Sequence, residues 1–390
     1  MTVEVVTLGC RLNLAESERI RALFGPSENL VVINSCAVTS EAVRQTRQAI
    51  RKARRDRPDA RLLVTGCAAE IEREQLVEMP EVDGLVENAA KLDPRAWNLP
   101  ASALPIPRKH TRAFVAVQTG CDHACTFCVI PQGRGASRSL TIPQVLREVE
   151  RDLAHGAAEV VLTGVDVTSW GHDLPNQPRL GTLVRALLEA FPELTRLRMS
   201  SLDGIEIDDE LFRLFADERR IMPHLHLSLQ HGHDLILKRM RRRHLRADAT
   251  DLVGRLRALR PDIAIGADLI SGFPTETEEM HQANLSIVEE LDIVHGHVFP
   301  YSPRPHTPAA RMPQVERAVV KRRAGELREA VAKRRTAWLA SLVGTPQKVL
   351  AEADGTGHAE NFARVALPDG TPRGALLDIT PTALSEGMLR

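Results

Sequence analysis

Aromatic residues, net charge and long apolar runs are all scarce in this chain of 390 residues. Phe, Trp and Tyr make up only 3% of it, which argues against the broad base-stacking platform that RNA-binding sheets use. The 51 basic and 51 acidic side chains cancel, so bulk charge indicates no nucleic-acid partner. No apolar run reaches the length of a membrane span, and the start, MTVEVVTLGC, lacks the basic and apolar regions of a signal peptide. We therefore expect a cytoplasmic location and no membrane partner.

Cysteine is also scarce, with six residues, but their positions are informative. Three of them follow short apolar runs, and three are crowded into GCDHACTFC; these are Cys10, Cys36 and Cys67, and Cys121, Cys125 and Cys128, respectively. In a reducing compartment such groups predict metal or catalytic sites rather than disulfides. The division into three and three predicts two metallic cofactors, each held by three thiolates and each keeping one open iron.

The spacing Cys-x-x-x-Cys-x-x-Cys lets three sulfurs wrap one face of a 4Fe–4S cubane while the fourth iron lacks a protein ligand. Zinc is the alternative, but it requires a fourth ligand. His123 lies inside the loop, too tightly placed to complete a tetrahedron easily, and no second cysteine pair follows.

The first hundred residues alternate strand-like and helix-like segments. Strands are predicted at 3–8, 30–33 and 61–65, and helices at 14–24, 40–57 and 69–78. This rhythm predicts a parallel-sheet α/β domain over residues 1–98. The carboxyl ends of parallel strands share one edge, so Cys10, Cys36 and Cys67 should converge there, each near a helix N-terminus that favours a thiolate. Three buried structural cysteines are the alternative.

A second set of β/α units follows residues 99–109, which hold three prolines and are predicted to be a linker. Strands are predicted at 113–119, 159–164, 194–200, 224–230, 263–271 and 293–299, separated by helices such as 142–155, 183–191 and 276–291. Six units predict an open (β/α)6 partial barrel over residues 107–335. The fold class is therefore α/β.

Several of these strands alternate polar and apolar side chains, which is unusual for a parallel sheet covered on both faces. The polar faces should line a lumen suited to a large polar ligand. Metal binding by the histidines is a sharper alternative to hydrogen bonding. These faces carry His224, His226, Ser228 and Gln230; Arg196, Arg198 and Ser200; and His295 and His297.

The tail, residues 337–390, has short strand candidates at 347–352, 362–367 and 375–379 between turn signals such as Asp-Gly. It predicts a small β domain, either a structural cap or a substrate-binding module.

The ordered motifs together resemble the methylthiotransferases of the radical S-adenosylmethionine (SAM) enzymes. The resemblance runs from Val3 to about Arg311 and extends more weakly over the tail, which resembles the family's TRAM domain. The motifs are LGCRLNLAESE, VINSCAVTSEAVRQTR, TGCAAE, GCDHACTFCVIPQGRGASRS, HLHLSLQHGHDLILKRMRRRH, DLISGFPTETEE and HVFPYSPRPHTPAARM.

The resemblance implies two 4Fe–4S clusters and SAM as cofactors. Cys121, Cys125 and Cys128 would hold the cluster whose open iron chelates SAM and whose electron yields a 5′-deoxyadenosyl radical. The other three cysteines would hold an auxiliary cluster carrying the sulfur to be donated. One SAM would methylate that sulfur, and a second would supply the radical that abstracts hydrogen from the substrate carbon.

Further residues match positions near these cofactors. Phe127 would shield the cluster or lie near the adenine, with plain packing as the alternative. Asn13 and Asn34 would orient the sulfur ligand, with helix capping as the alternative. Four residues at carboxyl ends of barrel strands are candidate SAM contacts: Gly164, Ser200, Gln230 and Gly272.

Within the family, Thr39 after Cys-Ala-Val and the arginines that follow resemble the branch acting on N6-threonylcarbamoyladenosine. The implied reaction is methylthio transfer to C2 of that nucleoside at tRNA position 37, with the base flipped out of its stack. Alternative substrates are isopentenyladenosine tRNA and a ribosomal-protein aspartate; the alternative class of protein is a non-catalytic zinc- or cluster-bearing RNA-binding protein.

The basic runs, including residues 44–57, suit phosphate contacts or solvated helix faces. A flavodoxin- or ferredoxin-type electron donor and a monomer are expected. After Trp338, Phe362 is the only aromatic residue of the tail, so other basic surfaces would have to share the grip on tRNA.

Overall fold

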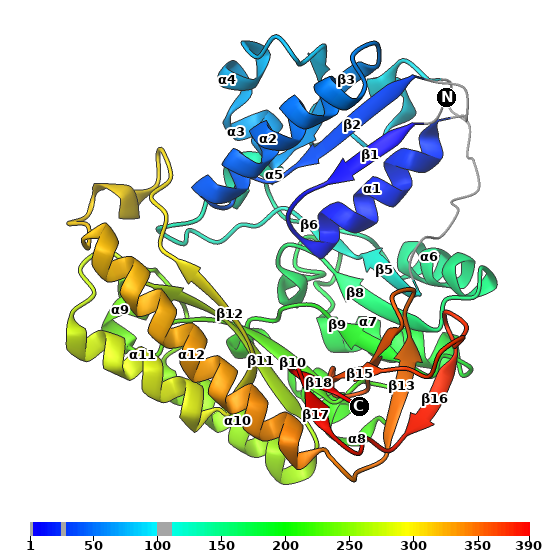
Figure 1. Cartoon of the computed structure of the whole chain (residues 1–390), viewed down its shortest axis with the longest axis vertical. Helices are drawn as coiled ribbons and strands as arrows, with labels where there is room; N and C mark the ends of the chain where they lie inside the picture. The colour runs from blue at the N-terminus through cyan, green and yellow to red at the C-terminus, as the bar shows by residue number, and fades with distance from the viewer. Residues whose placement is uncertain (1–2, 25–28, 100–110) are drawn as a thin grey trace.

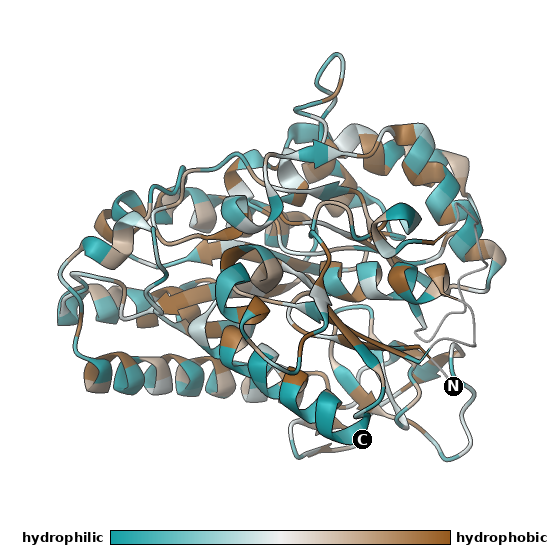
Figure 2. Ribbon diagram, turned by 90° about the horizontal axis from the view of Figure 1, so that it is seen from above, coloured by the Kyte–Doolittle hydropathy of each residue, from teal (hydrophilic) through white to brown (hydrophobic). Residues whose placement is uncertain are grey.

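The computed structural model describes residues 3–24, 29–99 and 111–390 (Figure 1). It has three parts in chain order: a parallel sheet with helices, a larger set of β/α units, and a strand-rich end. Apolar residues gather along the strands, while the helices carry alternating polar and apolar bands (Figure 2). In the described part of the chain, no helix has both the length and the apolar character needed to cross a bilayer. The expected linker lies outside these residues except for Leu99.

The N-terminal sheet is parallel with strand order β1-β2-β3-β4, as the sequence predicts except for the short β4. Strand β2 is buried along its whole length because helices cover both faces of the sheet. Val31 and Ile33 pack with Ile50 of α2 on one face, and Val32 packs with Ile20 of α1 on the other. The elements are β1 (Glu4–Thr7), α1 (Arg11–Leu23), β2 (Leu30–Ser35), α2 (Ser40–Asp56), β3 (Arg61–Gly66) and β4 (Gly84–Leu85).

The helix predicted at 69–78 is wrong in its extent. The structure has two short helices, α3 (Cys67–Ile71) and α4 (Arg73–Val77), which meet at Glu72. Helix α3 begins two residues earlier than predicted, because Gly66 at φ +91° turns the chain from β3 directly into the helix. Cys67 is thereby the first residue of a helix rather than part of the loop before it.

The central part contains the six predicted parallel strands in chain order, β5-β8-β9 and β10-β11-β12. Parallel bridges at Leu197–Ile221 and Leu202–Leu227 join the two sheets, so the strands form one open partial barrel. The strands are β5 (Arg112–Ala116), β8 (Glu159–Thr163), β9 (Leu197–Met199), β10 (His224–Gln230), β11 (Ala264–Ser271) and β12 (Ile293–Pro300).

Helices cover the outside of this partial barrel (Figure 1). They are α6 (Ile142–Ala154), α7 (Leu180–Ala190), α8 (Asp209–Asp217), α9 (Asp234–Arg239), α10 (Arg246–Leu259) and α11 (Glu278–Glu290), whereas α5 (Ile130–Arg134) packs on α3 of the N-terminal part. Four 3₁₀ turns complete the described helices: η1 (Pro94–Trp97), η2 (Val167–Ser169), η3 (Gly204–Glu206) and η4 (Pro308–Arg311).

Two predicted barrel strands are shorter than expected. The strand predicted at 113–119 ends at Ala116, and β6 (Gln118–Thr119) pairs antiparallel with β7 (Arg138–Ser139) instead. The strand predicted at 194–200 begins only at Leu197. The β6–β7 pair closes the base of the loop that carries the clustered cysteines.

The C-terminal part is a six-stranded sheet of order β16-β13-β14-β15-β18-β17, which fits a TRAM-like domain. Helix α12 (Arg317–Ser341) leads into it and crosses the predicted boundary near residue 336. The sequence identified three of its strands and missed the other three. The strands are β13 (Gln347–Ala351), β14 (Thr356–Ala359), β15 (Arg364–Ala366), β16 (Leu376–Ile379), β17 (Leu384–Ser385) and β18 (Met388–Leu389).

Phe362 inserts from this C-terminal sheet against the amino ends of the barrel strands. Its ring stacks on His224 of β10 at 5.1 Å between centroids and on His358 at 4.5 Å. The guanidinium of Arg198 lies 4.8 Å from the ring centroid, within cation–π range. Phe362 sits in a turn at φ +72°, two residues before β15 begins inside the predicted range 362–367, and its ring packs on the barrel.

Beside Phe362, the buried carboxylate of Glu159 binds Arg198 of β9 and Arg196, which directly precedes that strand. Glu159 accepts hydrogen bonds from Arg196 at 2.9 Å and from Arg198 at 3.0 Å. Burial alone would raise the pKa of Glu159, but the charges of Arg198 and Arg196 outweigh it and lower the pKa to about 2. Arg198 also donates to the carbonyl of Glu360 at 3.2 Å. The amino end of the lumen is therefore filled by protein rather than open.

Replacing Phe362 with Ala should lower the free energy of unfolding by about 2 to 3 kcal/mol, because the ring is partly exposed and a fully buried Phe costs about 3 to 5 kcal/mol. Both residues carry a Cβ, so the backbone strain at φ +72° cancels. Denaturant unfolding measures the change. The matched control is Phe299→Ala, whose ring is 40% exposed and should cost less than about 1 kcal/mol. Equal losses in the two variants would contradict the docking role.

Candidate functional site

The three clustered cysteines lie on the loop between β6 and α5, at the carboxyl edge of the barrel. Backbone N–H groups point at two of the sulfurs: His123 N donates to Cys121 Sγ and Ile130 N to Cys128 Sγ, both at 3.4 Å. Such N–H donors stabilise thiolates that hold iron–sulfur clusters. The loop is anchored where Cys121 N donates to the Gly135 carbonyl at 3.1 Å.

Charged side chains surround these thiols. Arg242 lies 3.8 Å from Cys125 Sγ and also donates to Asp203 at 2.8 Å. Burial raises the pKa of Cys121 to about 12, and the Asp166 carboxylate and the neighbouring thiols add to the rise. Burial also raises the pKa of Cys128 to about 12. Binding of a metal group by Cys121 and Cys128 would therefore have to release their protons.

His123 is directed at carboxylates. Its Nε2 lies 2.7 Å from Asp166 Oδ2, and Arg243 binds the neighbouring Glu206 at 2.6 Å. The hydrogen bonds to Asp166 and Glu206 raise the pKa of His123 to about 10, so it is charged at neutral pH. The ligand atoms of Cys121, His123 and Asp166 lie within 4.8 Å of one another, but a protonated histidine paired with a carboxylate is a poor fourth ligand for zinc.

The other three cysteines come together at the carboxyl edge of the N-terminal sheet. Cys10 is the N-cap residue of α1, Cys36 follows β2, and Cys67 begins α3. A side chain at Gly9, which has φ +91°, would meet Cys36 Sγ at 2.8 Å. Burial raises the pKa of Cys36 to about 11, with Cys67 and Cys10 close enough to add to the rise. Burial therefore outweighs the hydrogen bond from Val38 N and the charge of Arg134, which lower the pKa of Cys36.

Beneath this triad lies a buried charge network that the sequence did not reveal. Glu16 of α1 accepts two hydrogen bonds from Arg134, at 2.9 and 3.0 Å, and pairs with Lys91 at 2.5 Å. Burial would raise the pKa of Glu16, but Lys91 and Arg134 outweigh it and lower the pKa. Arg134 sits at the end of α5, so the network joins the two parts of the chain. Its sequence signals are the motif LGCRLNLAESE, which contains Glu16, and the segment PQGRG, which contains Arg134.

Asn13 and Asn34 belong to this network, and the alternative that they cap helices is wrong. Asn13 donates to the carbonyls of Leu8 and Ser35 and accepts from Arg134 at 2.6 Å. Asn34 donates to the Asn13 carbonyl at 2.9 Å and accepts from Lys91 at 3.2 Å. Both amides are buried and fully engaged, so they fix the strand-to-helix turns on which the thiols stand.

The two cysteine triads are neighbours. Helix α3 packs on α5, and a Cβ at Gly133 would lie 3.3 Å from Cys67 Cβ and 3.1 Å from Ile71. The side chain of Asn88 donates to the Gly133 carbonyl at 2.5 Å and lies 4.0 Å from Cys67 Sγ. Glycine at this position lets the loop that carries Cys128 lie against the helix that begins with Cys67.

The candidate SAM contacts lie along the same edge. Gly164 packs against the Gln118 carbonyl, where a Cβ would come within 2.8 Å. Ser200 has a buried hydroxyl without a hydrogen-bond partner in the described part of the chain, and Gln230 adopts φ +70° at the end of β10. Gly272 at φ +70° packs tightly on Val320 of α12, which explains glycine there by packing. Phe127 packs edge-to-face on Phe273 at 6.4 Å.

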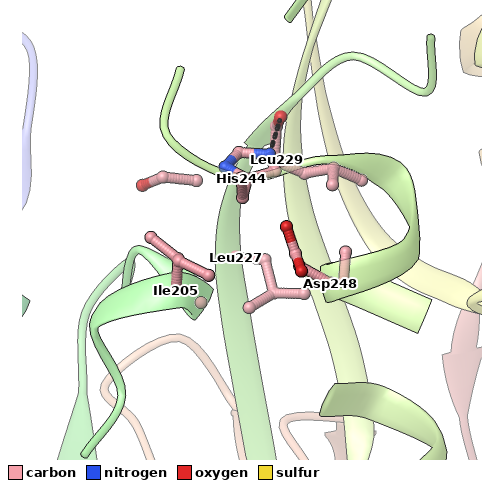
Figure 3. Close-up of a pocket in the computed structure, with 8 residues that line it drawn as sticks. Ile205, Leu227, Leu229, His244 and Asp248 are labelled. Carbon is pink, nitrogen blue, oxygen red and sulfur yellow. Dashed lines mark hydrogen bonds between the residues drawn. The ribbon is translucent and has the colours of Figure 1, made fainter. Parts of the chain in front are cut away.

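The polar lumen expected from the strand pattern is present in the half of the barrel away from Phe362. Asp268 of β11 lies 3.2 Å from His226 and 3.0 Å from His297. Burial would raise the pKa of Asp268, but the two histidines outweigh it and lower the pKa. A separate cavity, lined by Leu227, Leu229, Ile205 and others and holding about 10 Å³, lies between β10, η3 and α10 (Figure 3). It offers room for at most one water and is no substrate site.

An open parallel barrel with Cys-x-x-x-Cys-x-x-Cys on its first loop is the arrangement of a radical SAM enzyme. The family model of the radical SAM superfamily matches residues 115–285, and that of uncharacterized protein family UPF0004 matches residues 2–87. Among solved structures, the radical SAM methyltransferase TsrM from Kitasatospora setae has a TM-score of 0.56 at 17% identity, covering 76% of this chain and 68% of its own. This likeness shows the fold.

Curated relatives give the narrower assignment. Threonylcarbamoyladenosine tRNA methylthiotransferase MtaB of Rickettsia prowazekii is 42% identical over 405 residues, covering 99% of this chain and 96% of the relative. The tRNA-2-methylthio-N(6)-dimethylallyladenosine synthase of Paracoccus denitrificans is 34% identical, covering 90% and 86%. The chain belongs to the radical SAM methylthiotransferase family. It is accordingly an enzyme that uses a 4Fe–4S cluster and SAM.

Replacing Glu16 with Gln should lower the free energy of unfolding by about 3 to 5 kcal/mol, because it leaves two buried cations without their carboxylate. The loss should appear in denaturant unfolding of the iron-free protein as well as the loaded one. Glu210→Gln is the control, because Glu210 of α8 pairs with Arg185 of α7 near the surface. This substitution should change the free energy of unfolding by less than about 1 kcal/mol. Equal stability of the two variants would show that Lys91 and Arg134 have other counter-charges.

Proposed function

We propose that this protein transfers a methylthio group to C2 of N6-threonylcarbamoyladenosine at tRNA position 37. One observation carries the proposal: a relative named for that substrate matches nearly the whole chain at 42% identity. Relatives of the same name from Aquifex aeolicus and Bacillus subtilis, at 32% and 33% identity, support it. The adjacent cysteine triads are the arrangement that a two-site transfer requires.

Cys121, Cys125 and Cys128 hold one 4Fe–4S cluster in this proposal. The bound cluster supplies the electron that splits SAM into methionine and a 5′-deoxyadenosyl radical. Arg242 and the N–H groups of His123 and Ile130 offset the charge of the sulfurs. Phe127 shields the site on its apolar side, and Gly164, Ser200, Gln230 and Gly272 border the space for SAM at the carboxyl ends of the strands.

Cys10, Cys36 and Cys67 hold the second 4Fe–4S cluster. When bound, it supplies the sulfur that is methylated and transferred. Arg134 and Lys91 place two buried positive charges beneath it, which favours three thiolates over three thiols. The contact of α3 on α5 keeps the two cysteine triads adjacent, so the groups that they would hold would both lie within reach of one substrate.

The assignment of the substrate also rests on Thr39. Its hydroxyl accepts a hydrogen bond from Ala42 N at 3.1 Å and caps α2, so it has a structural role beside its likeness to the threonylcarbamoyladenosine branch. The Paracoccus relative favours isopentenyladenosine-type tRNA as the second candidate. The enzyme works in the cytoplasm as a monomer in this proposal and receives electrons from a flavodoxin- or ferredoxin-type donor.

Nucleoside mass spectrometry tests the substrate directly. Expression in a host that lacks its own enzyme should produce 2-methylthio-N6-threonylcarbamoyladenosine in bulk tRNA. Cells carrying an empty vector are the control. A methylthio mark on isopentenyladenosine or on a ribosomal protein instead would uphold the chemistry and refute the substrate. No mark from protein that contains its full iron would refute the function.

Two cysteine variants test the division of roles. Cys125→Ala should abolish cleavage of SAM, whereas Cys36→Ala should retain cleavage and lose methylthio transfer. Wild-type protein should bind about eight irons per chain if both clusters are cubane, and each variant about four. Measurements of 5′-deoxyadenosine, methylthiolated nucleoside and iron separate the outcomes. Loss of cleavage in Cys36→Ala with four irons still bound would contradict the two-cluster assignment.

A further inference from the structure

Four arginines from two parts of the fold line a cavity beside α2. Arg44, Arg47 and Arg51 lie at successive turns of that helix, a spacing that puts them on one face. Arg304 enters from the loop after β12. The cavity measures about 410 Å³, and its lining is completed by Ser40, Val43, Gln48 and Glu72. We call it the arginine cavity.

The arginine cavity contains more positive charge than its own residues neutralise. Glu72 is the one acidic residue that lines it, and its two oxygens are shared between Arg304 at 2.7 Å and Arg47 at 3.4 Å. Arg304 is only 4% exposed, yet its Nε has no hydrogen-bond partner in the part of the chain that the structure describes. One carboxylate shared between two guanidinium groups leaves the cavity with an excess of positive charge.

The remaining pairings of these arginines are weak. Arg44 pairs with Glu41 one turn away, where both side chains are more than half exposed. Arg51 lies 3.9 Å from Glu81 and is 59% exposed. Exposed ion pairs of this kind contribute about 0 to 1 kcal/mol. A stronger anion can therefore displace them at little cost.

The chemistry of the lining indicates which anion. Guanidinium groups form paired hydrogen bonds with phosphate oxygens. The lining contains no aromatic side chain and only Val43 as an apolar one, so it offers no surface on which a base could stack. Its volume exceeds the roughly 30 Å³ that one water occupies by more than tenfold. These features suit backbone phosphates and not a nucleobase.

The arginine cavity also lies beside the proposed reaction site, because α2 and Glu72, which line it, adjoin the segments that carry Cys36 and Cys67. Ser40 N donates to Ser302 Oγ at 3.1 Å and the two hydroxyls meet at 2.8 Å, which joins the start of α2 to the loop after β12. Ser40 is four residues beyond Cys36, and Glu72 directly follows α3, which begins with Cys67. An anion here is held by both parts of the fold at once.

We propose that the arginine cavity binds backbone phosphates of the tRNA substrate, next to the nucleotide presented to the cysteine triads. The identity of the RNA rests on the proposed function. Contacts of this kind position the RNA and carry no sequence information. They should therefore act equally on tRNA with and without the threonylcarbamoyl group.

The test is the double variant Arg44→Gln/Arg51→Gln in the full-length, iron-loaded protein. Binding of one tRNA, prepared with and without N6-threonylcarbamoyladenosine, is measured by fluorescence anisotropy across a salt series. The slope of log affinity against log salt should fall by about one for each arginine, so by about two. Affinity at physiological salt should fall about tenfold for both tRNAs.

Two further variants make the result interpretable. Arg44→Lys/Arg51→Lys keeps the charge, so it should keep the salt slope while losing paired hydrogen bonds. Arg213→Gln on α8, at the opposite end of the molecule (Figure 1), should match wild type in both binding and activity. Iron content and circular dichroism confirm that each variant is folded, and the single variants serve if the double one is not.

Unchanged binding by the folded glutamine variant would overturn the proposal. Loss confined to tRNA that carries the threonylcarbamoyl group would also overturn it, because the arginines would then read the modified base. The wild-type protein tests the proposed function separately. If it makes no methylthio product while the glutamine variant still loses two units of salt slope, the function fails and the phosphate site stands.

Discussion

The close contact of α3 with α5 is the constraint on which the rest of the site depends. Gly133 has no side chain, so the backbone after the cysteine loop lies against Cys67 itself. A Cβ there would lie 3.1 Å from the end of the Ile71 side chain and 3.3 Å from Cys67 Cβ, closer than ordinary van der Waals contact, so the packing favours glycine. Asn88 closes the contact by binding the Gly133 carbonyl. The two halves of the site are therefore packed as one unit although they come from separate sheets.

That contact brings a carboxylate, a lysine and an arginine into the interior together. Glu16 comes from α1, Lys91 from the segment after β4, and Arg134 from α5. Such a buried trio is costly to desolvate and is stable only with all its partners present. It therefore specifies one relative position of the two sheets more strictly than apolar packing would. The same cations lie under the thiols, so the network that aligns the parts also sets the local electrostatics.

The strand rhythm and the cysteine spacing predicted the parallel sheets, the partial barrel and both triads, because each is a local pattern tied to one sheet edge. Lys91 and Arg134 could not be predicted, since their partner Glu16 is more than seventy residues away in sequence and no spacing rule connects them. The strand predicted at 362–367 is present as β15 (Arg364–Ala366), but it begins two residues later than predicted for a related reason. Phe362 has the β propensity of an aromatic residue, but contacts with His224 and Arg198 hold it in a left-handed turn.

The position of Phe362 also restricts how a substrate approaches. Its ring and the Glu159–Arg198 pair fill the amino end of the lumen, so a base enters from the carboxyl edge, where the triads lie. On that edge the rim includes the arginine cavity, formed by α2 and the loop after β12. A flipped adenosine needs its flanking backbone held while the base reaches inward. Because the chain carries no net charge, a few concentrated arginines on that rim, and not the overall field of the protein, have to hold it.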